Sequence, residues 1–417
     1  MEQKRILIPN GNFSEWALIN AAHRQGMYVI ASGLNENAPG NKFADEYVKA
    51  DYSDKEAMLQ LAKEKKIDYM MSNAHDAGTL STAYVCEQLG LPGHDSYEVT
   101  QTIHTKDRFK ALAKKLGIHT PIAEVFTDRA AALQYVLDQL NAGKKIILKP
   151  ADNASSVGVV APKTPEEAES AVNLAFDKSK SRTVIVEPFL EGFWVTCTSM
   201  IINQEVVAFF ADAALFYPQG EVEGAEFPMH LRANGGMQPA PYMDEWQSYI
   251  IEDFNKIARE LKLVDGKFHA ELMIAPDHSA QIFDLHRRFS GFPSPCPEWN
   301  YNTHLLWEDW VLKAECGMDL SDFPRGIRQD KYFHNRSVYA PRNGKLKKME
   351  LDTYLTAHMD PMHMQRNFTV ENVEVTDHIH QPVAWVKLRF NSYKEAEAMS
   401  DYVNDNFYSH VTFEYED

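Results

Sequence analysis

Short apolar runs alternate with helical patterns over the first 93 residues, and this alternation constrains the fold more than any other feature. The apolar run of residues 5–9 precedes a helical segment that Ser14 is suited to cap and that ends at Gly26. The same order continues with a strand pattern at 28–32, a helix opened by Asp54, a strand pattern at 67–71 and a helix at 79–89. Strands and helices that alternate in this way form parallel sheets with right-handed crossovers. We therefore predict an α/β, doubly wound parallel sheet at the N-terminus.

The loops at the ends of these strands carry polar side chains. In open α/β sheets ligands bind beyond the carboxyl ends of the strands, so these side chains are candidate contacts for a small polar substrate. They are Asn10, Asn12, Asn73, His75 and Asp76. The first loop lacks the G-x-G-x-x-G spacing of a dinucleotide site, which disfavours a nicotinamide-dependent oxidoreductase.

A second unit begins with a helix that carries Lys106 and ends at Gly117. The strand at 145–149 closes with Lys149, and a loop of small and hydroxyl residues follows at 151–159. An ammonium beside backbone N–H groups and hydroxyls can surround phosphate oxygens. The loop is not a Walker loop, because it has no Gly-Lys-Ser/Thr and no following helix.

The remaining pattern predicts further strands, helices and one long loop. Strands are expected at 183–189, 195–202, 206–210, 337–340, 373–375 and 383–390, and helices at 130–140, 245–261, 303–316 and, finally, 393–404. Residues 211–241 lack periodicity and are expected to form a functional loop, in which Arg232 could pair with a substrate carboxylate.

The segment 268–293 predicts a hairpin whose two strands each place an acid among apolar neighbours. These acids are Glu271 and Asp284, and a carboxylate in such surroundings is costly unless it is paired or holds a cation. Mg²⁺ prefers oxygen ligands and shares its shell with nucleotide phosphates. His286, Arg287 and Arg288 follow directly and could clamp a phosphate or a carboxylate.

Composition excludes several classes of partner. The formal net charge of −17 over 417 residues disfavours non-specific binding to nucleic acid or to an anionic membrane. Four scattered cysteines without paired spacing suit a reducing compartment. With no signal-peptide pattern and no apolar run that could span a bilayer, a cytoplasmic protein is expected.

These motifs, in this order, resemble the ATP-grasp superfamily and, within it, the carboxylate-amine ligase branch that includes biotin carboxylase and D-alanine ligase relatives. The resemblance implies an ATP-grasp fold (α+β in the nucleotide domain) between the N-terminal sheet and a small C-terminal α+β domain. It divides the chain into an N-terminal domain at 1–104, a nucleotide lid subdomain at 105–190, a central catalytic subdomain at 191–330 and a C-terminal domain at 331–417.

The resemblance also implies roles for individual residues. ATP would be bound by Lys106, Lys149, Ser155, Ser156, Gly158, Glu187, Phe189, Leu190 and Glu191. The metal ion, Mg²⁺ or Mn²⁺, would be held by Glu271, Asp284 and His286. Lys149 and Arg288 would be catalytic, because they would stabilise the transferred phosphoryl group.

Three positions depart from the family pattern. Asp284 stands where glutamate is usual, and His286 stands where an asparagine would bind the metal through its amide oxygen. An imidazole is a poorer partner for a hard cation, so the number of metal ions is left open. Trp194 occupies a position often held by the acid that contacts ribose, and Glu187 or Glu191 could replace that acid.

The implied activity is that of an ADP-forming carbon-nitrogen ligase that activates a small carboxylate, such as an amino acid, and joins it to an amine. Two alternatives keep the fold: a catalytically degenerate protein that binds ATP as a sensor, and a ligase that activates bicarbonate or formate. Small-molecule substrates are expected, without nucleic acid or membrane, and a homodimer is implied by resemblance alone.

A second metal site is not favoured among the C-terminal histidines and methionines, because they lack an established ligand spacing. This group consists of His358, Met359, Met362, His363, Met364, His378 and His380.

Overall fold

The computed structural model describes residues 3–153, 157–216, 233–289, 299–300, 303–327, 331–359, 370–378, 382–399 and 407–416. These residues form two compact units. The first unit comprises Met1–Gly192, Cys197–Phe209 and Asp244–Ile327, and the second comprises Phe193–Thr196, Phe210–Met243 and Arg328–Asp417. The division into four domains stays a prediction.

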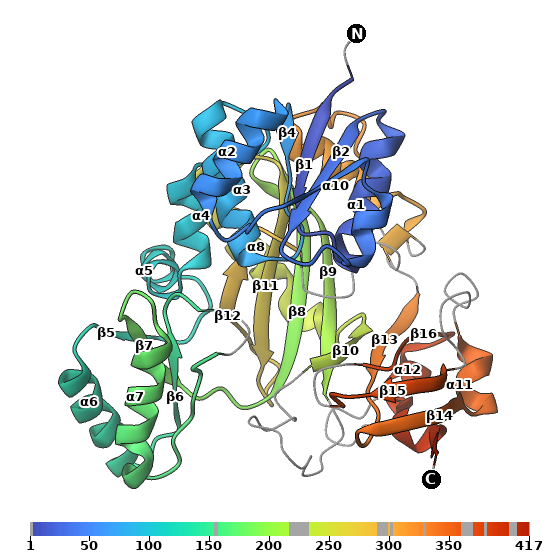
Figure 1. The fold of residues 1–417 in the computed structure, drawn as a ribbon. Helices are drawn as coiled ribbons and strands as arrows, with labels where there is room; N and C mark the ends of the chain where they lie inside the picture. Colours follow the sequence, from blue (N-terminus) through green and yellow to red (C-terminus); the bar gives the residue numbers. More distant parts are fainter. Residues whose placement is uncertain are drawn as a thin grey trace. The chain divides into compact units, whose positions relative to one another are not determined.

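The first unit opens with the predicted parallel sheet, in the strand order β3-β2-β1-β4 (Figure 1). Its strands are β1 (Arg5–Pro9), β2 (Tyr28–Gly33), β3 (Glu46–Lys49) and β4 (Tyr69–Met70), and its helices are α1 (Phe13–Arg24), α2 (Lys55–Lys65), α3 (Asp76–Leu89) and α4 (Tyr97–His104). Strand β1 pairs in parallel with both β2 and β4 and is almost fully buried, which explains its continuous apolar sequence.

Local capping agrees with the sequence at α2 and differs at α1. Asp54 caps α2 by accepting hydrogen bonds from the backbone N–H groups of Glu56 and Ala57. Helix α1 begins one residue earlier than its predicted cap, so Ser14 lies inside the helix and donates to Glu15 instead. The prediction of a Ser14 cap was therefore wrong. Strand β3 and helix α4 were missed, because β3 is short and partly exposed and α4 is only two turns long.

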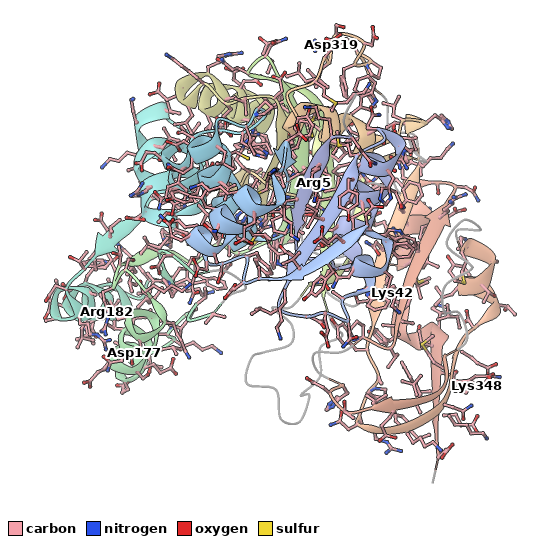
Figure 2. The ribbon with its side chains drawn as sticks, turned by 45° about the horizontal axis from the view of Figure 1, so that its top comes forward. Arg5, Lys42, Asp177, Arg182, Asp319 and Lys348 are labelled. Atoms are coloured by element: carbon pink, nitrogen blue, oxygen red, sulfur yellow. The ribbon has the colours of Figure 1, made fainter. Side chains whose placement is uncertain are left out.

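The first unit also contains a three-stranded antiparallel sheet, in the order β5-β7-β6, covered by two helices (Figure 1). Its elements are β5 (Glu124–Phe126), β6 (Ile146–Pro150), β7 (Val184–Pro188), α6 (Arg129–Asn141) and α7 (Ala168–Lys178). Val136, Phe176 and Val186 belong to its buried core. Asp177 and Arg182 lie on its surface, where Figure 2 shows their side chains.

A third sheet region contains strands in the order β12-β11-β8-β9. Its strands are β8 (Phe193–Ile202), β9 (Glu205–Phe216), β11 (Gly266–Ile274) and β12 (Ala280–His286), and its helices are α5 (Lys106–Leu116), α8 (Met243–Leu261) and α10 (Trp307–Glu315). Phe254 of α8 packs edge-on against Phe268 of β11, with ring centroids 5.0 Å apart. This packing fixes the predicted hairpin of β11 and β12 against the buried face of α8.

The second unit continues the strand order as β9-β10-β13-β16 and adds a small sheet, β15-β14-β17. These elements are β10 (Ala233–Gln238), β13 (Tyr332–Val338), β14 (Gly344–Leu351), β15 (Val370–Val375), β16 (Ala384–Phe390), β17 (Val411–Tyr415), α11 (Thr353–His358) and α12 (Tyr393–Met399). The prediction of a loop at 211–241 was wrong at both ends, because β9 extends to Phe216 and β10 begins at Ala233. The central residues 217–232 lie outside the described residues. The predicted terminal helix is followed by β17, which forms a sheet edge.

The fold class predicted from the sequence is confirmed: a parallel sheet precedes a large antiparallel sheet and a small α+β region. None of the helices in the described ranges combines the length and the apolar character needed to cross a bilayer.

One buried ion pair ties strand β11 to α10. Lys267 Nζ lies 2.5 Å from Glu315 Oε1 and 2.7 Å from the Ser72 carbonyl oxygen, and the Lys267 side chain is only 1% exposed. We expect Lys267→Met to lower the free energy of unfolding by roughly 3–5 kcal/mol, because Glu315 would keep a buried charge without its partner. Urea denaturation measures this loss.

The matched control is Lys115→Met, because Lys115 pairs with Glu260 on the surface with its side chain 66% exposed. Its change should stay within about 1 kcal/mol. Equal losses in the two variants would contradict a special role for the buried pair.

Candidate active site

The two acids of the predicted hairpin lie opposite each other. Glu271 of β11 pairs in register with Asp284 of β12, and His269 pairs with His286. Burial, followed by the charge of Asp284, raises the pKa of Glu271. Burial opposes ionisation of Asp284 as well, but Lys106 and His286 outweigh it and lower the pKa of Asp284. The two carboxylates thus repel each other, and a bound cation would relieve that repulsion.

Lys106 links the hairpin to the start of the small-residue loop. It is the first residue of α5, and its Nζ lies 2.8 Å from Asp284 Oδ2 and 3.2 Å from the Asn153 carbonyl oxygen. The side chain is 9% exposed. The sequence prediction that Lys106 and Asp284 belong to one site is therefore supported by direct contact.

Lys149 also lies close to the hairpin. Its Nζ is 5.1 Å from the centroid of the Phe283 ring, and its charge contributes to the lowered pKa of Asp284. It lies 2.7 Å from Glu187 Oε2, while Lys110 Nζ lies 2.7 Å from Glu187 Oε1. No role was predicted for Lys110, because its helical position is equally typical of an exposed residue. Glu187 therefore holds two ammonium groups, and its contact with adenine or ribose stays a prediction.

Asp76 lies at the centre of a cluster formed with Arg288, His104 and His286. Arg288 Nε lies 2.7 Å from Asp76 Oδ1, and Nη2 lies 3.1 Å from Oδ2. His104 Nδ1 and His286 Nδ1 each lie 3.0 Å from Oδ1. Burial raises the pKa of Asp76, but His286 and Arg288 reverse the effect and hold the pKa well below its usual range. The carboxylate is ionised and fixes Arg288 beside the acidic hairpin.

The prediction that His286, Arg287 and Arg288 form one clamp was wrong for Arg287. Arg287 points away from the acids: Nε lies 2.6 Å from Asp95 Oδ2, and Nη1 lies 2.6 Å from the Lys267 carbonyl oxygen. Strand β12 ends at His286, and the Arg287 side chain just beyond it is directed at Asp95 instead of the acids. Arg287 thus holds protein groups together, whereas Arg288 and His286 lie beside Asp76 and the hairpin acids.

The expected contacts at the ends of the N-terminal strands mostly bind the protein itself. Asn73 Nδ2 donates to the Ser14 carbonyl oxygen at 2.5 Å, and the Asn10 side chain contacts His75. Asp76 reaches the hairpin rather than standing alone as a substrate contact. Asn12 is the residue before α1 and makes no capping bond through its side chain.

For the other predicted nucleotide contacts, the described residues show individual surroundings but no common site. Gly158 has φ +80°, and a Cβ there would lie 2.6 Å from Lys178 Cβ, so this position requires glycine. Phe189 is partly exposed, and Glu191 pairs with Lys145. Ser155, Ser156 and Arg232 lie outside the described residues. The binding roles of Gly158, Phe189, Leu190 and Glu191 stay predictions.

The C-terminal histidines that are described have ordinary polar partners. His358 Nδ1 lies 2.8 Å from the Tyr354 carbonyl oxygen, and His378 Nδ1 lies 2.9 Å from Asn343 Oδ1. Met362, His363, Met364 and His380 lie outside the described residues. Within the described residues, the group of His, Asp or Glu close enough to hold a metal consists of Asp76, His104 and His286.

Comparisons with known proteins agree with this arrangement of acids and lysines. Residues 104–292 match the family model "Phosphoribosylglycinamide synthetase, ATP-grasp (A) domain". The resemblance to the ATP-grasp superfamily and to its carboxylate-amine ligase branch is confirmed by this match and by the relatives that follow.

Individual relatives agree with this assignment. A phosphoribosylamine–glycine ligase of Yersinia pestis is 28% identical over 279 residues, which cover 59% of this chain and 63% of that protein. The chain thus spans less than two thirds of this curated relative.

Two solved structures share the fold over nearly the whole chain. One is an L-amino acid ligase from Bacillus licheniformis, with a TM-score of 0.76, 18% identity and full coverage of both chains. The other is the biotin carboxylase domain dimer of a 2-oxoglutarate carboxylase from Hydrogenobacter thermophilus, in complex with MgADP, ADP and bicarbonate. It has a TM-score of 0.73 and 15% identity, and covers 99% of this chain and 90% of that one.

Glu15 of α1 is a buried acid that the sequence analysis missed. It is 0% exposed, and burial raises its pKa to about 7, although a hydrogen bond from Ser14 opposes the shift. Because Glu15 in the unfolded chain ionises near its ordinary pKa of 4.5, the unfolded state binds fewer protons than the folded state above that pH. Stability should therefore fall as the pH rises from about 4.5 to 7 and then level off.

We expect this loss to be roughly 3 kcal/mol in the wild type and absent in Glu15→Gln, whose side chain does not ionise. Urea denaturation of both proteins at pH 4.5 and pH 8 measures the difference. A wild type and a variant with parallel pH profiles would show that Glu15 titrates normally.

Proposed function

We propose that this protein is an ATP-dependent ligase that activates a small carboxylate as an acyl phosphate and transfers the acyl group to an amine, releasing ADP and phosphate. The observation that carries the proposal is the convergence of Lys149, Lys106 and the paired acids Glu271 and Asp284. The names of the matched relatives support the reaction class.

The acidic pair suits a divalent cation. Glu271 and Asp284 offer carboxylate oxygens from adjacent strands. Burial raises the pKa of Glu271, and the repulsion from Asp284 raises it further. Mg²⁺ or Mn²⁺ bound there would offset the charge on the ATP phosphates. Glu271, Asp284 and His286 are the residues that would hold it.

The protein's own groups act by position and charge. A substrate carboxylate oxygen attacks the γ-phosphorus, and the bond to the leaving ADP oxygen breaks. Lys149 and Lys106 would stabilise the phosphate oxygens, and Arg288 the transferred group. Arg288 would exchange part of its contact with Asp76 for the phosphoryl group. The amine nitrogen then attacks the acyl carbon, phosphate leaves, and the amine loses a proton.

Water must be kept from the acyl phosphate, because the intermediate hydrolyses when wet. The loop that begins at Asn153 and reaches Gly158 is suited to this task, since Asn153 already contacts Lys106. The substrates are proposed to be small molecules, with an amino acid as the favoured carboxylate, and the setting is proposed to be cytoplasmic. A homodimer stays a prediction.

Removal of one electrostatic group should impair turnover strongly. We expect Lys149→Ala and Glu271→Gln each to lower kcat by roughly two to three orders of magnitude, the usual loss for one transition-state stabiliser. The measurement is coupled ADP release over pools of amino acids, small carboxylates and amines.

The matched control is Lys144→Ala, because Lys144 is exposed and bonds to Gln139. Its rate should equal that of the wild type. ADP release at near-normal rates by the Lys149 and Glu271 variants would remove these residues from the mechanism. ATP binding by the wild type without ADP release in any pool would favour the sensor alternative.

A further inference from the structure

Lys110 of α5 is a buried lysine that no step of the proposed reaction uses. Its side chain is 5% exposed, and three acceptor atoms lie close to its Nζ. Glu187 Oε1 lies at 2.7 Å, Thr120 Oγ1 at 2.6 Å and the Pro121 carbonyl oxygen at 3.3 Å. An ammonium group has three N–H bonds, so these acceptors leave none for a phosphate. Lys110 is therefore suited to hold protein groups in place and not to bind the nucleotide itself.

The ammonium group of Lys110 is anchored to the protein beyond Glu187. Thr120 Oγ1, which accepts from Lys110, itself donates to the Ile282 carbonyl oxygen of β12 at 2.6 Å. Thr120 and Pro121 precede β5, and Glu187 lies near the end of β7. Lys110 thus joins the chain that enters the sheet β5-β7-β6 to the strand that leaves it. The position of the Glu187 carboxylate is tied to β12 through this contact.

Glu187 is a buried carboxylate that can accept further hydrogen bonds. Its side chain is 1% exposed, and Lys149 Nζ lies 2.7 Å from Oε2 while Lys110 Nζ lies against Oε1. A carboxylate accepts about four hydrogen bonds, so two ammonium groups do not exhaust it. Burial opposes the ionisation of Glu187, but Lys149 and Lys110 outweigh it and lower the pKa of Glu187. The carboxylate is thus ionised, fixed and able to accept from another donor.

A fixed carboxylate distinguishes amino groups from carbonyl oxygens, because it accepts from the first and repels the second. Adenine carries an amino group on carbon 6 of its ring, whereas guanine and hypoxanthine carry a carbonyl oxygen there. Phe189, two residues beyond Glu187, leaves 38% of its surface exposed, and an aromatic surface is suited to stacking on a base. This part of the chain therefore suits a purine with a 6-amino group.

We propose that Lys110 is a positioning residue for base recognition: it holds the Glu187 carboxylate in place, and the site thereby prefers a purine nucleotide with a 6-amino group to one with a 6-oxo group. The inference rests on the proposed function, which brings ATP to this site, and deepens it by giving Lys110 a role. Lys110 acts through Glu187, so its loss changes which base is bound more than how fast the phosphoryl group is transferred.

The direct test is calorimetric titration of the full-length protein with ADP and with inosine diphosphate, each in the presence of Mg²⁺. The wild type should bind ADP more tightly, because inosine diphosphate presents a 6-oxo group to Glu187. In Lys110→Met the dissociation constant for ADP should rise about tenfold, while that for inosine diphosphate changes little, because the carboxylate loses the partner that fixes it.

The matched control is Lys114→Met, because Lys114 is an exposed lysine of the same helix. Its two dissociation constants should equal those of the wild type. Equal binding of the two diphosphates by the wild type would overturn the inference, as would an unchanged preference in Lys110→Met.

Steady-state kinetics separates a positioning role from a catalytic one. In the coupled assay of ADP release, Lys110→Met should raise the KM for ATP about tenfold and lower kcat by no more than about threefold. Lys149→Ala, by contrast, lowers kcat itself. A loss confined to kcat in Lys110→Met would place Lys110 in phosphoryl transfer and overturn the positioning role.

The pH dependence of the wild type tests the inference without any variant. Burial lowers the pKa of Lys110 to about 8, Lys149 adds to this shift, and the charges of Glu187 and Asp284 oppose it. As the ammonium group loses its proton, its hold on Glu187 weakens, so the preference for ADP over inosine diphosphate should fall between about pH 7 and pH 9. Lys110→Met should lack this change. A wild-type preference that stays constant over this range would overturn the inference even if Lys110→Met does not fold.

The two proposals fail in different ways. Binding of ADP with a base preference that does not depend on Lys110 would sink this inference alone. If the wild type binds neither ADP nor ATP, the proposed ligase function falls together with it.

Discussion

The contact between Asp76 and Arg288 is the constraint on which the rest of the site depends. Asp76 begins α3 beside the N-terminal parallel sheet, and Arg288 follows the acidic hairpin, 212 positions further along the chain. The pairing is bidentate and largely buried, so neither partner can be removed without leaving a charge in a poorly solvated place. The same carboxylate orients His286 and His104. One acid from the first sheet thus organises the basic groups beside Glu271 and Asp284.

Sequence patterns were sufficient where structure is determined locally. The apolar strand β1, the Asp54 cap and the hairpin of β11 and β12 follow from periodicity and turn residues that are adjacent in the chain. Glu271 and Asp284 were found because a carboxylate among apolar neighbours is chemically conspicuous. Strand β10 and its pairing with β13 were missed, because its glycines carry no apolar pattern and its register depends on a partner about a hundred residues away.

The site was less accessible to prediction than the fold. Lys110 and Glu15 look like ordinary helical residues, and only tertiary packing reveals that they are buried and have shifted pKa values. Arg287 and Arg288 are adjacent and chemically identical, yet Arg287 binds Asp95 and Arg288 binds Asp76. Motifs identified the chemistry, whereas the partner of each charge was determined by contacts distant in sequence.

Glu187, shared by Lys110 and Lys149, has an electrostatic consequence. The ionised triad carries one net positive charge, held between β6, β7 and α5. Burial lowers the pKa of Lys110 to about 8, so near neutral pH this lysine is mostly charged but lies closer to deprotonation than an exposed lysine. An anion that approaches Lys149 therefore meets a net positive charge whose two ammonium groups are already held by Glu187, and little reorganisation of these groups is required when it arrives.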